Sequence, residues 1–455
     1  MQASPRVGPV AAVVIPGGVL ALLSTTVVGV AVPELAAEFP ADADQVHWAA
    51  TAALLAAGIA IPLSGWASLR FGMRRTWLVA VLLFTLGSLA VSLAPSLPAL
   101  IAFRTLQGLG GGALEPIMLS ALATAAGPAR MGRVMGAAGA AMSAGPLLGP
   151  LVGGVLIESL GWRWIFAAIA AAGAIVLLAS WFALPRDDRG RSTLDALGLL
   201  LLAGASVLLL AGLSRAASAD GLDPAAWGML AGGLVLALGL IAWVRRRGER
   251  AIVDAGTFRA PGFAPGVVVM TLVGAAVYPL FFGLPQFYRD AAGLSPAVAG
   301  LLIAPYAIGT LAAMPVTGRL SDRIGARPLV IAGALATLAA SIAFAFSGSA
   351  APVWWFAVLS LLIGLGTGSI GGPAVGATYR GLAPEKIPSG STILFIANQL
   401  GGAFGVALFA GIIRTGGTDG AWTQELGTLP MVLPAAACLF IALVALRLGG
   451  GNHRA

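Results

Sequence analysis

The chain has 455 residues, of which 58% are hydrophobic and only 10% are charged, and its formal net charge is +8. Such a small charged fraction cannot cover the surface of a soluble globule of this length. The composition therefore excludes a soluble protein and predicts an integral membrane protein. The basic residues are spread over alternate gaps between apolar runs, which argues against a nucleic-acid-binding protein.

Apolar runs of membrane-spanning length follow one another along the whole chain, and in lipid such runs satisfy their backbone groups as α-helices. The fold class that we predict is therefore an all-α integral membrane protein, with no soluble domain. We predict fourteen transmembrane helices, at about residues 9–31, 47–68, 76–94, 98–122, 133–157, 163–184, 194–213, 226–244, 264–287, 297–316, 328–347, 353–378, 390–412 and 430–448.

The distribution of positive charge predicts the topology. On a fourteen-helix reading, 21 of the 26 Lys and Arg residues lie in the gaps on one side and four lie on the other. Because cytoplasmic loops carry the excess of Lys and Arg, both termini are expected in the cytoplasm of a multi-pass inner (plasma) membrane protein.

Two charged gaps are copies of each other. The segment GRLSDRIGARP begins at Gly318, and GWASLRFGMRR begins at Gly65. Asp322 can pair with a nearby Arg at a helix end and hold the cytoplasmic ends of neighbouring helices together in one state. The first copy has Leu69 in place of the carboxylate, so its latch is incomplete. The candidate gating residues are Gly65, Arg70, Arg74, Gly318, Asp322, Arg323 and Arg327.

Two charged side chains lie inside one predicted span, where a charge is costly and usually functional. Arg104 and Glu115 are eleven residues apart, which brings them to nearly the same helix face. A carboxyl facing a wet central cavity can bind a proton or a cationic substrate in turn, so Glu115 is a candidate for proton coupling. The alternative reading is a structural hydrogen bond near Pro116.

Further motifs occur in a fixed order. The first span holds LSTTVVGVAVP from Leu23, the fourth holds RTLQGLGGG from Arg104, and the fifth holds GPLLGPLVGG from Gly145, followed by WRWIF from Trp162. With the duplicated basic gap, these motifs resemble the major facilitator superfamily and, within it, the fourteen-span drug:proton antiporters of the EmrB/QacA type.

The resemblance implies two six-helix bundles plus two extra spans between them. The bundles would comprise residues 1–190 and 264–455, with the extra spans in 191–245 and a basic cytoplasmic linker in 246–263. This division fits the repeat, because the distance between its copies holds about eight spans at ~30 residues each.

The resemblance also implies functional residues. Arg104 and Gln107 would lie beside the proton path, and the small-residue stripe Gly145, Pro146, Gly149 and Pro150 would be the antiporter motif; glycines at this spacing also let helices pack closely. The chain departs from many relatives at Ser24, where they carry an acidic residue. Coupling would then depend on another carboxyl, such as Glu115, or be absent.

Candidate substrate contacts are the polar and aromatic positions of several spans. Tyr278, Phe282 and Gln286 share one face of a proline-interrupted helix, which suits a large amphipathic or aromatic solute. Packing or lipid contact is the alternative role of such side chains. The full set is Ser24, Thr26, Tyr278, Phe282, Gln286, Tyr306, Asn398 and Gln399.

These patterns predict a monomeric secondary transporter that exports drug-like or amphipathic small molecules against protons, with the lipid bilayer as its environment and no cofactor or metal. The alternatives are an exporter or an uncoupled facilitator of a specific metabolite, and a non-transporting membrane sensor. No catalytic residues are expected, because no span shows paired carboxylates, metal-ligand spacing or a nucleophile with its base, and no phosphate-binding loop occurs.

Overall fold

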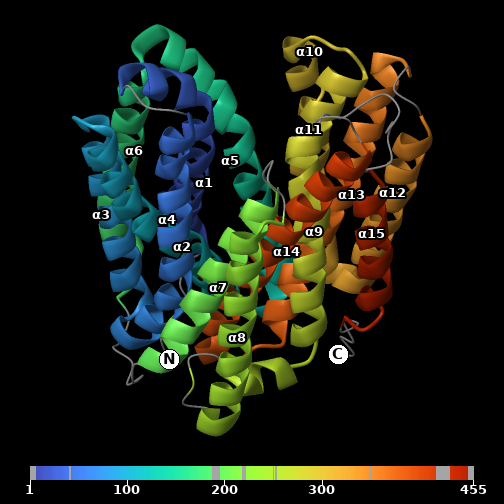
Figure 1. Cartoon of the computed structure of the whole chain (residues 1–455). Coiled ribbons are helices and arrows are strands. Elements are labelled where there is room, and N and C mark those ends of the chain that lie inside the picture. The colour runs from blue at the N-terminus through green and yellow to red at the C-terminus, as the bar shows by residue number, and fades with distance from the viewer. Residues whose placement is uncertain are drawn as a thin grey trace.

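The computed structural model describes residues 7–39, 43–186, 195–217, 222–248, 251, 254–347, 351–416 and 431–448, and its regular elements there are all helical (Figure 1). The first six long helices are α1 (Val7–Glu38), α2 (Ala43–Phe71), α3 (Met73–Ser92), α4 (Leu97–Ala126), α5 (Met131–Leu160) and α6 (Trp162–Ala183). Two more follow, α7 (Ala196–Ala217) and α8 (Pro224–Arg247). The remainder are α9 (Phe263–Gln286), α10 (Pro296–Leu301), α11 (Ala304–Ile324), α12 (Ala326–Phe346), α13 (Val353–Arg380), α14 (Ile387–Gly416) and α15 (Val432–Ala445).

Thirteen of the fourteen predicted spans each coincide with one helix and the fourteenth falls on two, which confirms the all-helical prediction. The run at 297–316 is divided into α10 and α11, because Pro305 lacks a backbone N–H and its ring clashes with the preceding turn. Within the described residues, eleven helices are long and apolar enough to cross a membrane, and α15 is apolar but shorter. The molecule is thus a multi-pass membrane protein, and the exact number of crossings stays a prediction.

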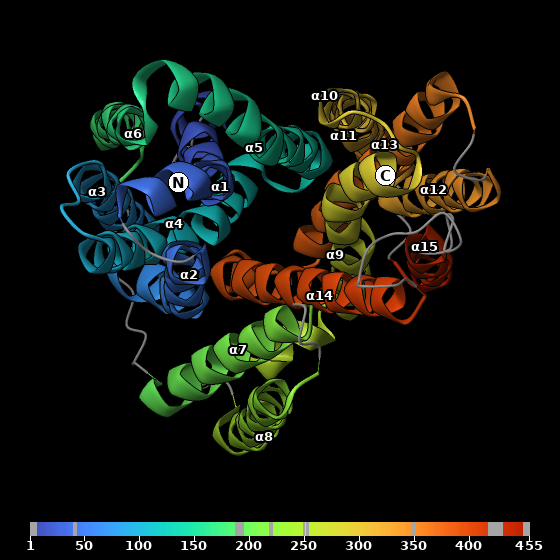
Figure 2. The same ribbon diagram turned by 45° about the horizontal axis from the view of Figure 1, so that its top comes forward.

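The helices form two bundles with a helix pair beside them. Helices α1–α6 gather in one bundle, and α9 and α11–α15 gather in the other (Figures 1 and 2). Helix α7 packs on α2 of the first bundle and on α14 of the second, and α8 packs on α7. The pair therefore lies over one side of the seam between the bundles, as Figure 2 shows.

The bundles meet at one end of the seam. Helix α5 packs on α11 and α13, and α14 packs on α2 and α4. The approach is close: a Cβ atom at Gly318 would lie 2.5 Å from the carbonyl oxygen of Gly132. The buried core of the first bundle continues into the second through Tyr379, Ile387 and Leu394. Toward the opposite end the ribbons of α5 and α11 diverge (Figure 1).

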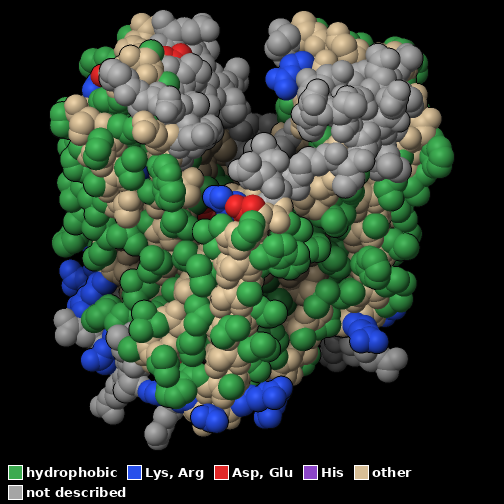
Figure 3. All heavy atoms as spheres, in the orientation of Figure 1, with side chains coloured by type: hydrophobic (Ala, Val, Ile, Leu, Met, Phe, Trp, Pro, Cys, Tyr) green, Lys and Arg blue, Asp and Glu red, His purple; other side chains and the backbone are tan. Residues whose placement is uncertain are grey.

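The end at which the bundles meet is basic. Exposed arginines lie at the α2–α3 junction, at Arg70 and Arg75, and at the end of α8, at Arg245 and Arg246. Lys and Arg side chains gather along this lower edge, below a wide hydrophobic belt (Figure 3).

The opposite end of the α7–α8 pair is closed by an ion pair. Arg215 and Asp223 are 2.7 Å apart, and Asp223 also caps α8 by accepting the N–H of Ala226. These hydrogen bonds, chiefly those from Arg215, hold the pKa of Asp223 below its usual range.

Candidate functional site

Arg104 connects four helices of the first bundle. Its Nη1 donates to Oε1 of Gln107 at 2.5 Å and to the carbonyl oxygen of Ser24 in α1 at 3.4 Å, and its Nε donates to the carbonyl oxygen of Ala49 in α2 at 3.3 Å. The guanidinium carbon lies 5.7 Å from the centre of the Phe166 ring in α6. The five-donor fork of an arginine suits such a junction, and a lysine would not.

Gln107 extends this junction to a fifth helix. Its Nε2 donates to Oγ of Ser88 in α3 at 2.7 Å, and both Arg104 and Gln107 are almost fully buried. Among the described residues Arg104 makes no ion pair, so its charge is met by carbonyl and amide oxygens and an aromatic face.

Glu115 lies in the second half of α4, toward the end at which the two bundles meet, and it is 8% exposed. It makes no hydrogen bond or ion pair with any residue that the structure describes. It lies close enough to Tyr278, in α9 of the other bundle, for an electrostatic interaction between the carboxylate and the phenol. A carboxyl in such a place is available to a proton or to a cationic group. Glu34, by contrast, is exposed.

The second bundle presents a polar group near Glu115. Tyr278 OH donates to Oε1 of Gln399 in α14 at 2.5 Å, and its ring packs against Gly402. Asn398 donates from Nδ2 to the carbonyl oxygen of Met270 at 2.9 Å, so its amide joins α14 to α9. Tyr278, Gln399 and Glu115 are thus three candidate residues from different helices that the structure brings together.

Other candidate substrate residues lie apart from this group. The Ser24 and Thr26 hydroxyls donate to carbonyl oxygens of α1 itself. Tyr306 is 3% exposed in the core of the second bundle, where its ring contacts Phe281. Gln286 is half-buried at the end of α9.

Parts of two predictions lie outside the described residues. These are the side chain of Phe282 and, in the antiporter motif, the side chains of Pro146 and Pro150 and the surroundings of Gly149; all four positions belong to helices. Gly145 is described, and a Cβ atom there would lie 2.7 Å from Cβ of Leu22 in α1, so this part of α5 requires a glycine for close packing.

Asp322 links the two bundles at their contact end. Its Oδ1 accepts the backbone N–H of Gly132 at 2.7 Å, and its Oδ2 accepts that of Arg133 at 2.9 Å, both in the first turn of α5. Arg380, from α13, donates to Oδ1 at 3.1 Å. The carboxylate therefore occupies the positive end of a helix dipole and is paired with a cation.

The neighbouring basic residues of the repeats play other parts. Arg323, Arg327 and Arg70 are exposed and make no ion pair within the described part of the chain. Arg74 donates to the carbonyl oxygen of Trp181 at 2.6 Å and stacks on its ring, so it joins α3 to α6 inside one bundle.

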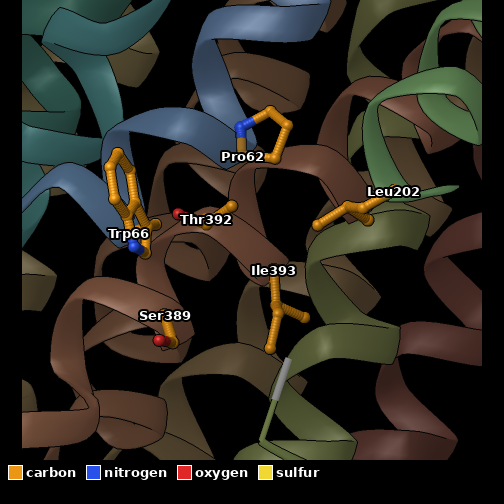
Figure 4. Close-up of a pocket in the computed structure, with 7 residues that line it drawn as sticks. Pro62, Trp66, Leu202, Ser389, Thr392 and Ile393 are labelled. Atoms are coloured by element: carbon orange, nitrogen blue, oxygen red, sulfur yellow. The ribbon is translucent and has the colours of Figure 1, made fainter. Parts of the chain in front are cut away.

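The first repeat forms a different contact. A Cβ atom at Gly65 would lie 2.6 Å from Oγ1 of Thr392, so α2 and α14 touch where the first latch would be. Beside them a crevice with room for about one water molecule opens toward α7. Its lining residues are Pro62, Gly65, Trp66, Leu202, Ser389, Thr392 and Ile393 (Figure 4).

Sequence reasoning did not find Arg380, Gly132 or Arg133 as partners of Asp322. The sequence pattern indicated only a nearby Arg at a helix end. Arg380 ends a helix 58 residues further on, and the two donors on α5 are backbone groups that no side-chain motif reports. It also missed Ser88 as the partner of Gln107.

Two helical bundles that meet at one basic end, with buried ionisable groups between helices, define a membrane transporter. The sequence matches the Major Facilitator Superfamily over residues 14–406 and again over residues 266–453, and the chain belongs to this family. Transporters of the family carry small molecules and need no bound cofactor.

Similar proteins include transporters with resistance names. The "Multidrug resistance protein B homolog" of Mycobacterium tuberculosis (strain ATCC 25618 / H37Rv) is 36% identical over 410 residues, which cover 88% of this chain and 75% of that protein. The "Putative multidrug resistance protein MdtD" of Cronobacter sakazakii (strain ATCC BAA-894) is 30% identical over 393 residues, which cover 86% and 83%.

Solved structures share the fold at low identity. A structure of the proton:xylose symporter XylE has a TM-score of 0.69 at 18% identity and covers 96% of this chain and 94% of its own. The human organic anion transporter MFSD10 has a TM-score of 0.67 at 17% identity and covers 97% and 100%.

Proposed function

We propose that this chain is a proton-coupled exporter of drug-like or amphipathic small molecules, of the fourteen-span antiporter type, working by alternating access. It acts as a monomer in the inner (plasma) membrane with both termini in the cytoplasm. The observation that carries the proposal is Glu115: a buried carboxyl without a fixed partner, on the first bundle, facing Tyr278 of the second. The resistance names of two relatives support the substrate class.

Glu115 provides the coupling. When the cavity faces one side, the carboxyl takes up a proton; when it faces the other, it releases the proton as a substrate or a cationic group competes for the site. Arg104 and Gln107 lie on the same helix and fix its position relative to α1, α2 and α3. Their role is to fix the position of α4 beside the proton path rather than to pair with Glu115.

The Tyr278–Gln399 pair provides the recognition surface, with Asn398 bracing α14 against α9. A phenol ring and an amide give an amphipathic solute one stacking face and one hydrogen-bond partner. We keep Ser24, Thr26, Tyr306, Phe282 and Gln286 as weaker candidates for substrate contact.

Asp322 holds the cytoplasmic side closed. Its two bonds to the first turn of α5 exist only while the bundles touch at this end, so they favour the outward-facing state over the inward-facing state. Gly318 and Gly65 let the bundles approach, while the exposed Arg323, Arg327 and Arg70 anchor the basic face against anionic headgroups. Arg74 braces α3 against α6.

The test is transport in inverted membrane vesicles. With an imposed proton gradient, a panel of cationic and neutral amphipathic compounds should accumulate inside the vesicles, and a protonophore should abolish the accumulation. Vesicles from cells that lack the protein are the matched control and should show no accumulation. Equal accumulation with and without the gradient would contradict coupling.

The second candidate function is uncoupled or metabolite-specific transport, and the absence of an acid at Ser24 favours it. The two functions differ in one readout. A facilitator equilibrates its substrate across the vesicle membrane but never concentrates it, whatever the gradient.

A further inference from the structure

We propose that the Ser120 and Ser391 hydroxyls form a second cytoplasmic gate, made of neutral groups, on the α4–α14 side of the seam. Tyr379 also donates to Ser391, from within the second bundle. The inference rests on alternating access as proposed above, and it assigns to these residues a role separate from that of Asp322.

The contact between the two serines crosses the seam. Ser120 Oγ, on α4, lies 2.8 Å from Ser391 Oγ, on α14, although the residues are 271 positions apart. Ser120 is 2% exposed and Ser391 is 0% exposed. Within the described residues no other pair of hydroxyl groups joins the two bundles.

The hydrogen bonds around Ser391 form a complete set. Tyr379 OH donates to Ser391 Oγ at 2.8 Å, and Ser391 Oγ donates to the carbonyl oxygen of Ile387 at 3.0 Å. A hydroxyl has one proton and two lone pairs, so Ser391 accepts from Tyr379 and from Ser120 while it donates to Ile387. The proton and both lone pairs of Ser391 Oγ are all in hydrogen bonds only when the bundles touch.

Ser120 has an alternative acceptor. Its Oγ also lies 2.8 Å from the carbonyl oxygen of Pro116, in its own helix. When the bundles separate at the cytoplasmic end, the hydroxyl can turn to Pro116 and is not left unsatisfied. The gate therefore has two discrete arrangements, and opening gives up the bond that Ser391 accepts across the seam without leaving the Ser120 donor unpaired.

This gate compensates for the departure at Leu69. On the α5–α11 side, a carboxylate on a helix end closes the seam. On the opposite side, where α14 packs on α2 and α4, Leu69 offers no carboxylate. The seam is closed there by the serine pair of α4 and α14 and by the contact of Thr392 with Gly65.

The first test is a disulfide across the gate. Ser120→Cys and Ser391→Cys are combined in the Cys438→Ser background, and the full-length protein in membranes is treated with a mild oxidant. We expect a cross-link that stops transport and is reversed by dithiothreitol, with each single-cysteine variant as control. Failure to cross-link, or transport at the control rate in cross-linked protein, would overturn the gate.

The second test needs no transport assay, so its outcome is separate from that of the proposed function. A reporter, Thr392→Cys in the Cys438→Ser background, is buried in the seam and is labelled by a maleimide from the cytoplasmic face only when the seam opens. Adding Ser120→Ala should speed labelling about fivefold, the effect of losing one net hydrogen bond.

Tyr379→Phe is the matched variant for this second test. It removes a hydrogen bond of the same kind, but both partners lie in the second bundle and move together. Labelling should change less than about twofold. Equal effects of Ser120→Ala and Tyr379→Phe, or no effect of either, would overturn the assignment.

Discussion

The carboxylate of Asp322 in the second bundle accepts the backbone N–H of Gly132 in the first bundle at 2.7 Å. The bond places a negative side chain on the first turn of α5, where backbone donors have no partner within the helix. The Asp322 side chain is 13% exposed, so water screens this interaction only in part. The two bundles are therefore fastened by a charge on a helix end.

We expect Asp322→Asn to weaken the closed cytoplasmic side. The asparagine keeps the shape but has one oxygen for two backbone donors, and it loses the ion pair with Arg380. Hydrogen bonds to a charged group contribute ~1.5–3 kcal/mol, so transport should fall at least about tenfold at an unchanged protein level. Arg323→Gln, at the exposed neighbour, is the control, and equal loss in both variants would argue against a specific latch.

Adding a carboxylate to the first repeat should have a smaller effect. Leu69→Asp restores the motif, but this side of the seam is already closed by other contacts. We expect transport within about threefold of the wild type, since position 69 is half-buried at the helix end and a salt bridge near the surface contributes only ~0–1 kcal/mol. A gain or loss as large as that of Asp322→Asn would show that the repeats are equivalent.

Arg104→Lys should lose activity although the charge remains. The planar guanidinium of Arg104 donates to the carbonyl oxygens of Ser24 and Ala49 and to Gln107 at the same time. A compact ammonium cannot reach all three acceptors, so part of the junction is lost. The thermal midpoint of unfolding in detergent should fall together with transport. A variant that keeps the wild-type midpoint and transports normally would contradict the role of the fork.

The topology predicts opposite labelling at the two ends of the α7–α8 pair. In the Cys438→Ser background, Leu222→Cys should react with an impermeant maleimide from outside intact cells, and Ala255→Cys should react only after permeabilisation. Both positions are exposed, so access depends on the side of the membrane alone. Reversed labelling would place the termini outside.

The sequence predicts much of the fold because each membrane helix is recognisable from its own apolar run. Runs such as 98–122 and 353–378 carry their own apolar length, and the repeat around Asp322 marks the duplicated halves. Pro305 also signals the division of one run, although the prediction treated that run as a single span.

Contacts between distant helices are harder to predict. The partners of Asp322 are backbone donors of α5 and the distant Arg380, and the meeting of Glu115 with Tyr278 depends on how the bundles dock. Small residues carry little sequence signal for that geometry, since Ser120 reads as an ordinary helix residue until Ser391 is placed beside it.

The proposed coupling of transport to protons by Glu115 is tested most directly by efflux with Glu115→Gln in inverted vesicles. The amide keeps the shape but fixes the neutral form. We expect accumulation against a gradient to be abolished, exchange of substrate down its gradient to persist, and substrate binding to lose its pH dependence. If the variant still concentrates substrate with the wild-type response to pH, Glu115 is not the coupling group and the facilitator reading or Glu34 takes its place.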